Sequence, residues 1–334
     1  MRPWKFSLLA LAVGVVVFAL ALLLGSGYLF FAGYVVLQFI VLATAWNILG
    51  GYCGYVNFGS AAFFAIGTYT TVALQKVGAN SGRFLSGTFA EFLQPLFPLS
   101  IPTAVIVSGT IAGVIGLGMG YLTLRLRGVF FAIATLAMAV VLQTLVINWE
   151  FVGGSRGAYI IRPATVSFGP FTLGYIEYLF LIMLMLAVIA LSVARLIERS
   201  RLGYGFATIR DDEMAAEAAG VPTLRLKLIA TTVSGAFMGM AGTTFPYYLS
   251  YVEPSAAFNL SYAVNTIAMP LIGGMTMWAG PLVGAVLLGS VQQVVQVTVS
   301  SEWNLLIVGV LLVVFVTVAP NGIIGWVSKW KKKR

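Results

Sequence analysis

Histidine is absent from this 334-residue sequence, and cysteine occurs only once, as Cys53. The absence of histidine removes the most common general base and the most common metal ligand. A single cysteine excludes an intrachain disulfide and a metal site built from several cysteines. The sequence therefore predicts a protein without catalytic residues, without a bound metal and without a cofactor.

Charged residues are also scarce, at 9% of the chain, whereas hydrophobic residues make up 60%. A soluble domain carries about 25% charged residues, so this composition indicates a polytopic membrane protein. At roughly 20 residues per membrane-spanning helix, the chain has room for about ten spans and their loops. We predict an all-α transmembrane bundle that forms a single domain over residues 1–334.

Ten apolar runs are interpreted as spans. They are Ser7–Leu24, Tyr28–Leu49, Gly59–Gln75, Leu99–Leu122, Val129–Trp149, Gly174–Arg195, Leu228–Leu249, Ala263–Trp278, Leu282–Val299 and Leu305–Ala319. The eighth and ninth runs are close together, so residues 263–299 are also compatible with a re-entrant pair or a broken helix. The first run resembles a signal peptide, but it is long enough to span and no small-residue cleavage region follows it. We therefore predict a retained first helix.

Lysine and arginine are distributed unevenly between the two sides of the predicted bundle. With an inside N-terminus and alternating spans, fifteen of the 19 basic residues lie inside and four lie outside. Loops on the cytoplasmic side carry such an excess. We therefore predict that both termini are cytoplasmic. The C-terminal sequence WKKKR is then an anchor at the surface of the membrane lipid and not a nucleic-acid site.

Two expected energy sources are missing from the chain. None of the ten acidic residues lies in the middle of a predicted span, whereas ion-driven transporters usually place a carboxylate at membrane depth. The phosphate-binding motif G-x-x-x-x-G-K-[S/T] is also absent, because no lysine follows a glycine. Any ATP that drives transport must therefore bind to another polypeptide. A secondary transporter, a passive channel and a membrane scaffold are the alternatives.

The polar side chains inside the predicted spans are neutral. Gln292 and Gln296, for example, are one helical turn apart and share a face. Such side chains are tolerated where they face a water-filled path or another helix, so both a translocation pathway and interhelical hydrogen bonding are compatible with the pattern. The candidate pathway residues are Asn57, Ser60, Gln143, Asn265, Gln292 and Gln296.

The longest polar segment between apolar runs extends from Glu198 to Lys227. Within it, Asp211–Ala219 is predicted to be a short helix, because acidic residues favour a helix N-terminus and Gly220 favours a left-handed stop. An isolated helix of this length is unstable in water, where roughly 12–15 residues are needed. The helix therefore either docks on a partner or is an ordinary solvated loop helix.

The order Glu217–Ala218–Ala219–Gly220 between two spans resembles the coupling loop of ABC importer permeases. The longer string SRLGYGFATIRDDEMAAEAAGV resembles more specifically the permeases of branched-chain amino acid importers, the Liv type with its LivM branch. Segments Gly51–Tyr69, Arg125–Gly128 and Ile272–Ala285 are similar to the same family. The resemblance implies a type II importer-like permease fold with a cytoplasmic coupling loop at residues 197–227. The coupling residues that it implies are Asp211, Glu213, Ala216, Glu217, Ala218, Ala219 and Gly220.

The resemblance also implies an assembly in a bacterial plasma (inner) membrane. Its other members would be two cytoplasmic ATP-binding subunits, a second related permease that forms a heterodimer, and a periplasmic or lipid-anchored substrate-binding protein. The implied cargo is a branched-chain amino acid, with other amino acids, urea and short amides as alternatives. Ser60 departs from the family pattern, in which many members carry Gln or His, and this departure weakens the assignment of the cargo.

Overall fold

The computed structural model describes residues 3–79, 99–162, 165–168 and 171–298, together with 306–307, 309–310, 312–314, 317 and 322–325. Most of the segment between the third and fourth predicted spans lies outside the described residues, as do much of the tenth predicted span and the basic tail. The described chain is almost entirely helical, which confirms the predicted all-α membrane fold.

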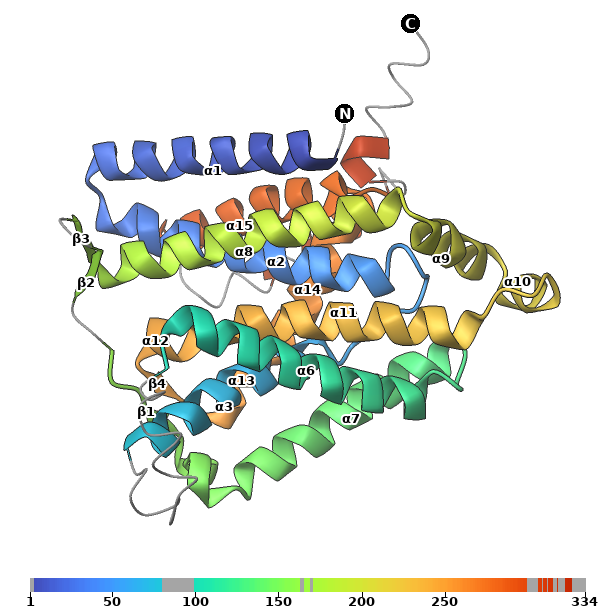
Figure 1. Ribbon diagram of the computed structural model, residues 1–334, viewed down its shortest axis with the longest axis horizontal. Coiled ribbons are helices and arrows are strands. Elements are labelled where there is room, and N and C mark those ends of the chain that lie inside the picture. The colour runs from blue at the N-terminus through green and yellow to red at the C-terminus, as the bar shows by residue number, and fades with distance from the viewer. Residues whose placement is uncertain are drawn as a thin grey trace, which may run out of the picture.

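Among the described residues, nine helices of 14 residues or more form the bundle shown in Figure 1. They are α1 (Pro3–Leu24), α2 (Gly27–Leu49), α3 (Ser60–Ala79), α6 (Ile101–Thr123), α7 (Val129–Ile147), α8 (Tyr175–Glu198), α11 (Thr223–Thr243), α14 (Leu260–Gly273) and α15 (Ala279–Thr298) among the described residues. Shorter helices are α9 (Arg201–Asp211), α10 (Glu213–Ala218), α12 (Phe245–Leu249) and α13 (Pro254–Ala257). Two 3-10 turns, η2 (Glu150–Val152) and η3 (Gly154–Arg156), follow α7.

The two ends of the bundle differ in their secondary structure. Helices α9 and α10 project from one end, at the right of Figure 1, and short strands lie at the other end. Strand β1 (Ala158–Tyr159) pairs antiparallel with β4 (Tyr251–Val252), and β2 (Thr165–Phe168) pairs antiparallel with β3 (Phe171–Gly174). These two ends are called the α10 end and the β end below.

Helix α11 lies at the centre and packs against α2, α3 and α6. Its small residues allow this close packing, because a Cβ atom at Gly239 would lie 2.3 Å from the Ala112 Cβ of α6. A Cβ atom at Gly242 would lie 1.9 Å from the Phe64 carbonyl oxygen of α3. The Thr68 hydroxyl donates a hydrogen bond to the Gly242 carbonyl over 3.0 Å. Small residues and polar contacts of this kind stabilise helix packing in lipid, where the hydrophobic effect between helices is weak.

Seven segments among the described residues are long and apolar enough to cross a membrane. They are α1 from Lys5 onward, α2, α6, α7, α8, the combined stretch Thr223–Leu249 and α15. Helix α3 packs among them. Helix α14 has 14 residues and therefore a length of about 21 Å at 1.5 Å per residue, less than the roughly 30 Å of a bilayer core. The total of ten spans stays a prediction.

The predicted bounds of two spans are wrong. Run Ala263–Trp278 forms α14 only as far as Gly273, and α14 begins earlier, where the Asn259 side chain accepts a hydrogen bond from the Ser261 backbone N–H over 2.8 Å. Run Leu228–Leu249 begins five residues too late, because α11 starts at Thr223 directly after Pro222. At α14 a capping side chain outside the apolar run sets the start of the helix, whereas Pro222 precedes α11 without a side-chain capping hydrogen bond.

Candidate coupling surface and translocation cavity

The polar segment after α8 folds into two helices instead of the single predicted helix Asp211–Ala219. Asp211 is the last residue of α9, and Asp212 caps α10 by accepting a hydrogen bond from the Ala215 backbone N–H over 3.0 Å. The correction has a simple cause, since Asp212 competes successfully for the N-cap position, where aspartate is strongly favoured. The predicted left-handed stop at Gly220 is confirmed, with φ at 81°.

Helix α10 is held in place by a buried lysine of α11. Lys227, only 3% exposed, donates to Glu213 Oε1 over 2.7 Å, to the Leu124 carbonyl over 3.0 Å and to the Tyr55 hydroxyl over 3.1 Å. The Tyr55 hydroxyl in turn donates to Glu213 Oε2. An ammonium group has three donors, so Lys227 is fully satisfied. These contacts join α10 to α11, to the α2–α3 connection and to the α6–α7 connection.

A second, exposed pair extends this arrangement. The Arg127 guanidinium contacts both Glu217 oxygens at 3.1 and 3.0 Å, and the Thr223 hydroxyl donates to Glu217 Oε1 over 2.8 Å. The Thr223 hydrogen bond, followed by Arg127, lowers the pKa of the Glu217 carboxyl. The Arg127 pKa is raised, first by Glu213 and then by Glu217. We call these six residues, Tyr55, Arg127, Glu213, Glu217, Thr223 and Lys227, the coupling cluster.

The predicted coupling residues divide into inward and outward groups. Ala216 is buried against the apolar residues beneath α10, and Glu213 is largely covered by the coupling cluster. The remaining predicted residues are exposed, namely Asp211, Glu217, Ala218, Ala219 and Gly220. A protein that approached the α10 end would therefore meet the second group, while the first group fixes the position of the helix.

Cys53 lies beneath the same segment. Its side chain is buried, and burial raises the pKa of its thiol to about 12. A thiol with this pKa is protonated at neutral pH and is therefore a poor nucleophile and a poor metal ligand.

The C-terminal end of α8 connects α9 to the turn between α14 and α15, a contact that the sequence did not reveal. Glu198 Oε2, in the last turn of α8, accepts a hydrogen bond from the Trp278 backbone N–H over 2.7 Å. Trp278 directly precedes α15, where a carboxylate also interacts favourably with the helix dipole. The Arg195 guanidinium lies over the Phe6 ring, 4.0 Å from its centroid, and 5.4 Å from that of Trp278. The last turn of α8 thus holds the start of α15 from two positions.

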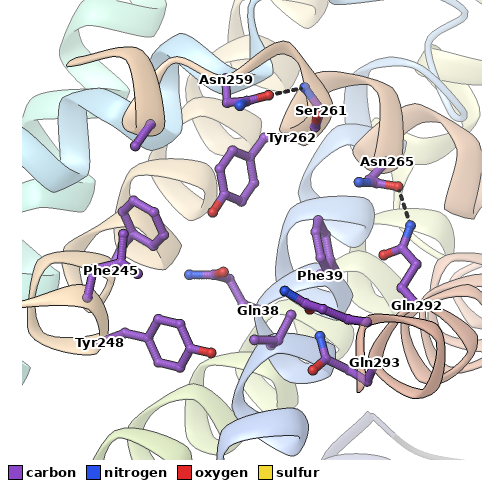
Figure 2. Close-up of a pocket in the computed structure, with 14 residues that line it drawn as sticks. Gln38, Phe39, Phe245, Tyr248, Asn259, Ser261, Tyr262, Asn265, Gln292 and Gln293 are labelled. Atoms are coloured by element: carbon purple, nitrogen blue, oxygen red, sulfur yellow. Dashed lines mark hydrogen bonds between the residues drawn. The ribbon is translucent and has the colours of Figure 1, made fainter. Parts of the chain in front are cut away.

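A cavity of about 350 Å³ lies between α2, α12, α14 and α15, within the lower range of small-molecule sites. Figure 2 shows Gln38 and Tyr262 extending into it. Its polar lining consists of Gln38, Asn259, Ser261, Asn265, Gln292, Gln293 and Gln296, and its aromatic lining of Phe39, Phe245, Tyr248 and Tyr262. None of the described residues that line it is charged. We call it the amide cavity.

Three of the six predicted pathway residues meet in the amide cavity, namely Asn265, Gln292 and Gln296. Gln292 Nε2 also donates to Asn265 Oδ1 over 2.7 Å, so the interhelical hydrogen bond that the sequence allowed is present as well. Gln38 joins them from α2, although the sequence gave no reason to separate it from other polar residues within spans.

The other three predicted pathway residues lie elsewhere. Asn57 precedes α3 near the α10 end, where its Oδ1 accepts a hydrogen bond from the Gly59 backbone N–H over 2.7 Å. Ser60 is the first residue of α3 and is buried, and Gln143 is half-buried on α7. The structure does not bring these three together with the amide cavity, because α3 and α7 do not line it.

A bundle of apolar helices, with an uncharged polar cavity among them and a short helix fixed at one end, is the architecture of a membrane-embedded helical protein. A family model described as the permease component of the branched-chain amino acid transport system matches residues 28–316. The chain belongs to this family, which confirms the predicted resemblance. Because the family consists of transport permeases, the chain is a transport subunit and not an enzyme.

Individual relatives agree with the family match. The chain is 28% identical over 309 residues to the high-affinity branched-chain amino acid transport system permease protein LivM of Escherichia coli strain K12, covering 86% of this chain and 67% of that protein. It is 22% identical over 302 residues to LivH of the same strain, covering 86% and 91%. It is 22% identical over 282 residues to the probable LivH of Methanocaldococcus jannaschii, covering 79% and 87%. No solved structure matches the chain.

Proposed function

We propose that this chain is the membrane-spanning permease of an ATP-driven importer of branched-chain amino acids. The family match and the names of the relatives support this class of protein and this cargo. The proposed mechanism rests mainly on the coupling cluster. Helix α10 has six residues and is too short to be stable alone, and the coupling cluster fixes it to the bundle. Importer permeases for urea, short amides or other amino acids are the alternative.

The exposed residues of α9 and α10 form the proposed docking surface for an ATP-binding subunit. Asp211, Glu217, Ala218, Ala219 and Gly220 would face that subunit. Glu213 and Ala216 would act by fixing α10 from beneath. The α10 end is then the cytoplasmic end, as the distribution of basic residues predicts.

The complete importer would contain four further proteins. Two cytoplasmic ATP-binding subunits supply the energy, a second related permease completes the membrane part, and a substrate-binding protein delivers the cargo at the β end. In this arrangement the chain is a multi-pass protein of the bacterial inner membrane with both termini in the cytoplasm. Closure of the ATP-binding subunits would move α10 and tilt the attached helices, which alternates access across the membrane.

Transmission from the docking surface to the pathway would run through α8. A displacement of α9 reaches the last turn of α8, where Glu198 and Arg195 hold Trp278. Trp278 directly precedes α15, which carries Gln292 and Gln296 into the proposed pathway. Asn265 lines the same pathway from α14. Asn57, Ser60 and Gln143 stay predicted pathway residues, at positions that a second permease subunit would have to complete.

The docking surface is tested by substituting Ala218→Trp, with Ala218→Ser as the matched control. Ala218 is exposed, so the indole adds bulk where the ATP-binding subunit approaches while the fold is retained. We expect the Trp variant to lose co-purification of the ATP-binding subunits and uptake of radiolabelled leucine, and the Ser variant to keep both. Normal co-purification and uptake by the Trp variant would contradict the assignment.

Exchanging the charges of Arg127 and Glu217 distinguishes a contact of Glu217 with the ATP-binding subunit from its contacts within this chain. Glu217→Arg disrupts the contact with Arg127, and the double variant Arg127→Glu/Glu217→Arg restores that pair with reversed polarity. The single variant Arg127→Glu is the control for the lost contact between Arg127 and Glu213. If Glu217 contacts the ATP-binding subunit, both variants with Glu217→Arg fail to transport. Recovery of leucine uptake by the double variant would show that Glu217 acts only within the chain.

A further inference from the structure

The amide cavity contains hydrogen-bonding atoms that the described chain leaves unused. Gln38 is 2% exposed, and its Nε2 donates to the Tyr34 hydroxyl over 3.0 Å and to the Ala241 carbonyl over 3.5 Å. Gln292 is 3% exposed and uses its Nε2 on Asn265 Oδ1. The hydrogen bonds found among the described residues involve Nε2 of Gln38 and of Gln292 and Oδ1 of Asn265, and none of them reaches the carbonyl oxygens of Gln38 and Gln292 or Asn265 Nδ2. Buried polar atoms within a membrane bundle are unfavourable unless a ligand or water completes them.

The unused atoms comprise both acceptors and a donor. The carbonyl oxygens of Gln38 and Gln292 accept hydrogen bonds from a cationic or neutral N–H group, whereas Asn265 Nδ2 donates to an oxygen. A solute with a net charge would enter without a counter-charge, since the lining is uncharged, and its desolvation would be strongly unfavourable. A zwitterion has no net charge and needs acceptors for its ammonium group and donors for its carboxylate.

Aromatic rings also line the amide cavity. The Phe245 and Tyr262 rings meet edge to face with their centroids 5.7 Å apart, and Phe39 lies 6.1 Å from Tyr262. Figure 2 shows Phe245 and Tyr262 on one side of the space and Gln292 and Gln293 on the other. Aromatic faces of this kind pack well against aliphatic side chains.

We propose that the amide cavity is a binding site for the zwitterion of a small aliphatic amino acid within the permease itself. The ammonium group contacts the Gln38 and Gln292 carbonyl oxygens, the carboxylate accepts from Asn265 Nδ2, and the aliphatic side chain packs on Phe39, Phe245 and Tyr262. The inference rests on the proposed import function and extends it, because it gives the permease a selectivity for net-neutral solutes that does not depend on the substrate-binding protein.

The test uses the complete importer in proteoliposomes, with leucine, lysine and glutamate as probes. Three variants alter the cavity, namely Gln292→Leu, Gln292→Glu and Phe245→Ala. Gln75→Glu changes the same type of side chain on α3 outside the cavity and is the matched control. ATPase stimulation by the liganded substrate-binding protein, measured in parallel, reports whether each variant is folded and assembled.

For Gln292→Leu we expect leucine uptake to fall at least tenfold while ATPase stimulation persists. Gln292→Glu should lower leucine uptake and raise the ratio of lysine to leucine uptake at least tenfold. Phe245→Ala should raise the KM for leucine more than the KM for alanine, because it removes part of the aliphatic subsite.

Two results would overturn the inference, and they are distinguishable. Wild-type leucine uptake together with unchanged uptake by all three cavity variants would show that the solute does not bind in this cavity, with the import function intact. Absence of leucine uptake by the assembled wild-type importer would overturn the proposed function and the inference with it.

Discussion

The coupling cluster and the amide cavity differ in how completely their polar atoms are satisfied. In the coupling cluster, Lys227 uses all three of its donors and Glu213 contacts Tyr55, Arg127 and Lys227. In the amide cavity, each of three buried amides retains an unused hydrogen-bonding atom among the described residues. A satisfied network favours one fixed geometry, whereas an unsatisfied one is stabilised by an incoming partner.

The two regions also differ in charge. The coupling cluster pairs two cations with two carboxylates at the α10 end, and these ion pairs hold α10 against the bundle. The lining of the amide cavity is uncharged. A charge within a transport path would bind its counter-ion and slow the release of the solute, so a neutral lining suits passage. Substitutions in the coupling cluster, in the amide cavity or in the contact between them should therefore have different effects on stability and uptake.

Lys227→Met should have the largest effect. The substitution leaves the Glu213 carboxylate largely buried beside Tyr55 without its main partner, and breaking such a pair typically destabilises by about 3–5 kcal/mol. We expect a large fall in the thermal midpoint of the purified permease and a loss of coupled ATPase activity. Arg225→Met, at an exposed position on the same helix, is the control and should change stability by about 0.5 kcal/mol or less. Equal stability of the two variants would show that the coupling cluster does not hold α10.

Gly284→Ala should disturb the amide cavity without altering any polar group. A Cβ atom at Gly284 would lie 1.8 Å from the Met269 carbonyl oxygen, so α14 and α15 must separate. Overpacking of this kind destabilises by about 1–3 kcal/mol, and the 2.7 Å contact between Gln292 and Asn265 would lengthen. Gly118→Ala, with no atom within 4 Å of its added Cβ, is the matched control. Leucine uptake should fall in the first variant only.

Glu198→Ala should separate the two regions functionally. It removes a charge-assisted hydrogen bond to the Trp278 backbone N–H, with an expected destabilisation of about 1.5 kcal/mol. We expect ATP hydrolysis to continue while leucine uptake falls, because α9 no longer controls the start of α15. Glu198→Gln retains an acceptor oxygen and should restore most of the uptake. A Gln variant as defective as the Ala variant would argue against this hydrogen bond.

The smallest expected effect concerns the pH dependence of the exposed Glu217 pair. Because the folded-state pKa of Glu217 is lowered from 4.5, its ionised form stabilises the fold fully above this pH. That contribution is lost as the pH falls below 4.5 toward the lowered pKa. The difference in thermal midpoint between the wild type and Glu217→Gln should therefore shrink as the pH falls from 7 to below 4.5. A difference that is constant over this range would show that Glu217 does not titrate as part of the pair.

The sequence predicted the class of fold and the position of the coupling segment, because both depend on local signals. Apolar runs identify helices in lipid, and Gly220 identifies the end of α10. Helix α9 was not predicted, since its sequence contains two glycines and looks like a polar loop. It forms because Phe206 and Ile209 are buried beneath it, which is a tertiary effect.

The cavity was predicted only in part for a related reason. The sequence indicates that Gln38 and Gln143 both lie within spans, but it does not say which faces of α2 and α7 meet other helices. Likewise, the contact between Glu198 and Trp278 joins residues 80 positions apart. Such contacts depend on how the helices are arranged around one another, and a single sequence carries no direct signal of that arrangement.

Because Cys53 is buried, the native chain should react very little with thiol-specific labels. Maleimides and spin labels react with the thiolate, and a buried thiol with a pKa of about 12 supplies almost none of it at neutral pH. Single cysteines placed at the exposed Leu126, in the α6–α7 connection, and at Gln296 would therefore be labelled selectively without first removing the natural cysteine. A pair of spin labels at these positions would report the distance between the α10 end and the amide cavity at each stage of the ATP cycle.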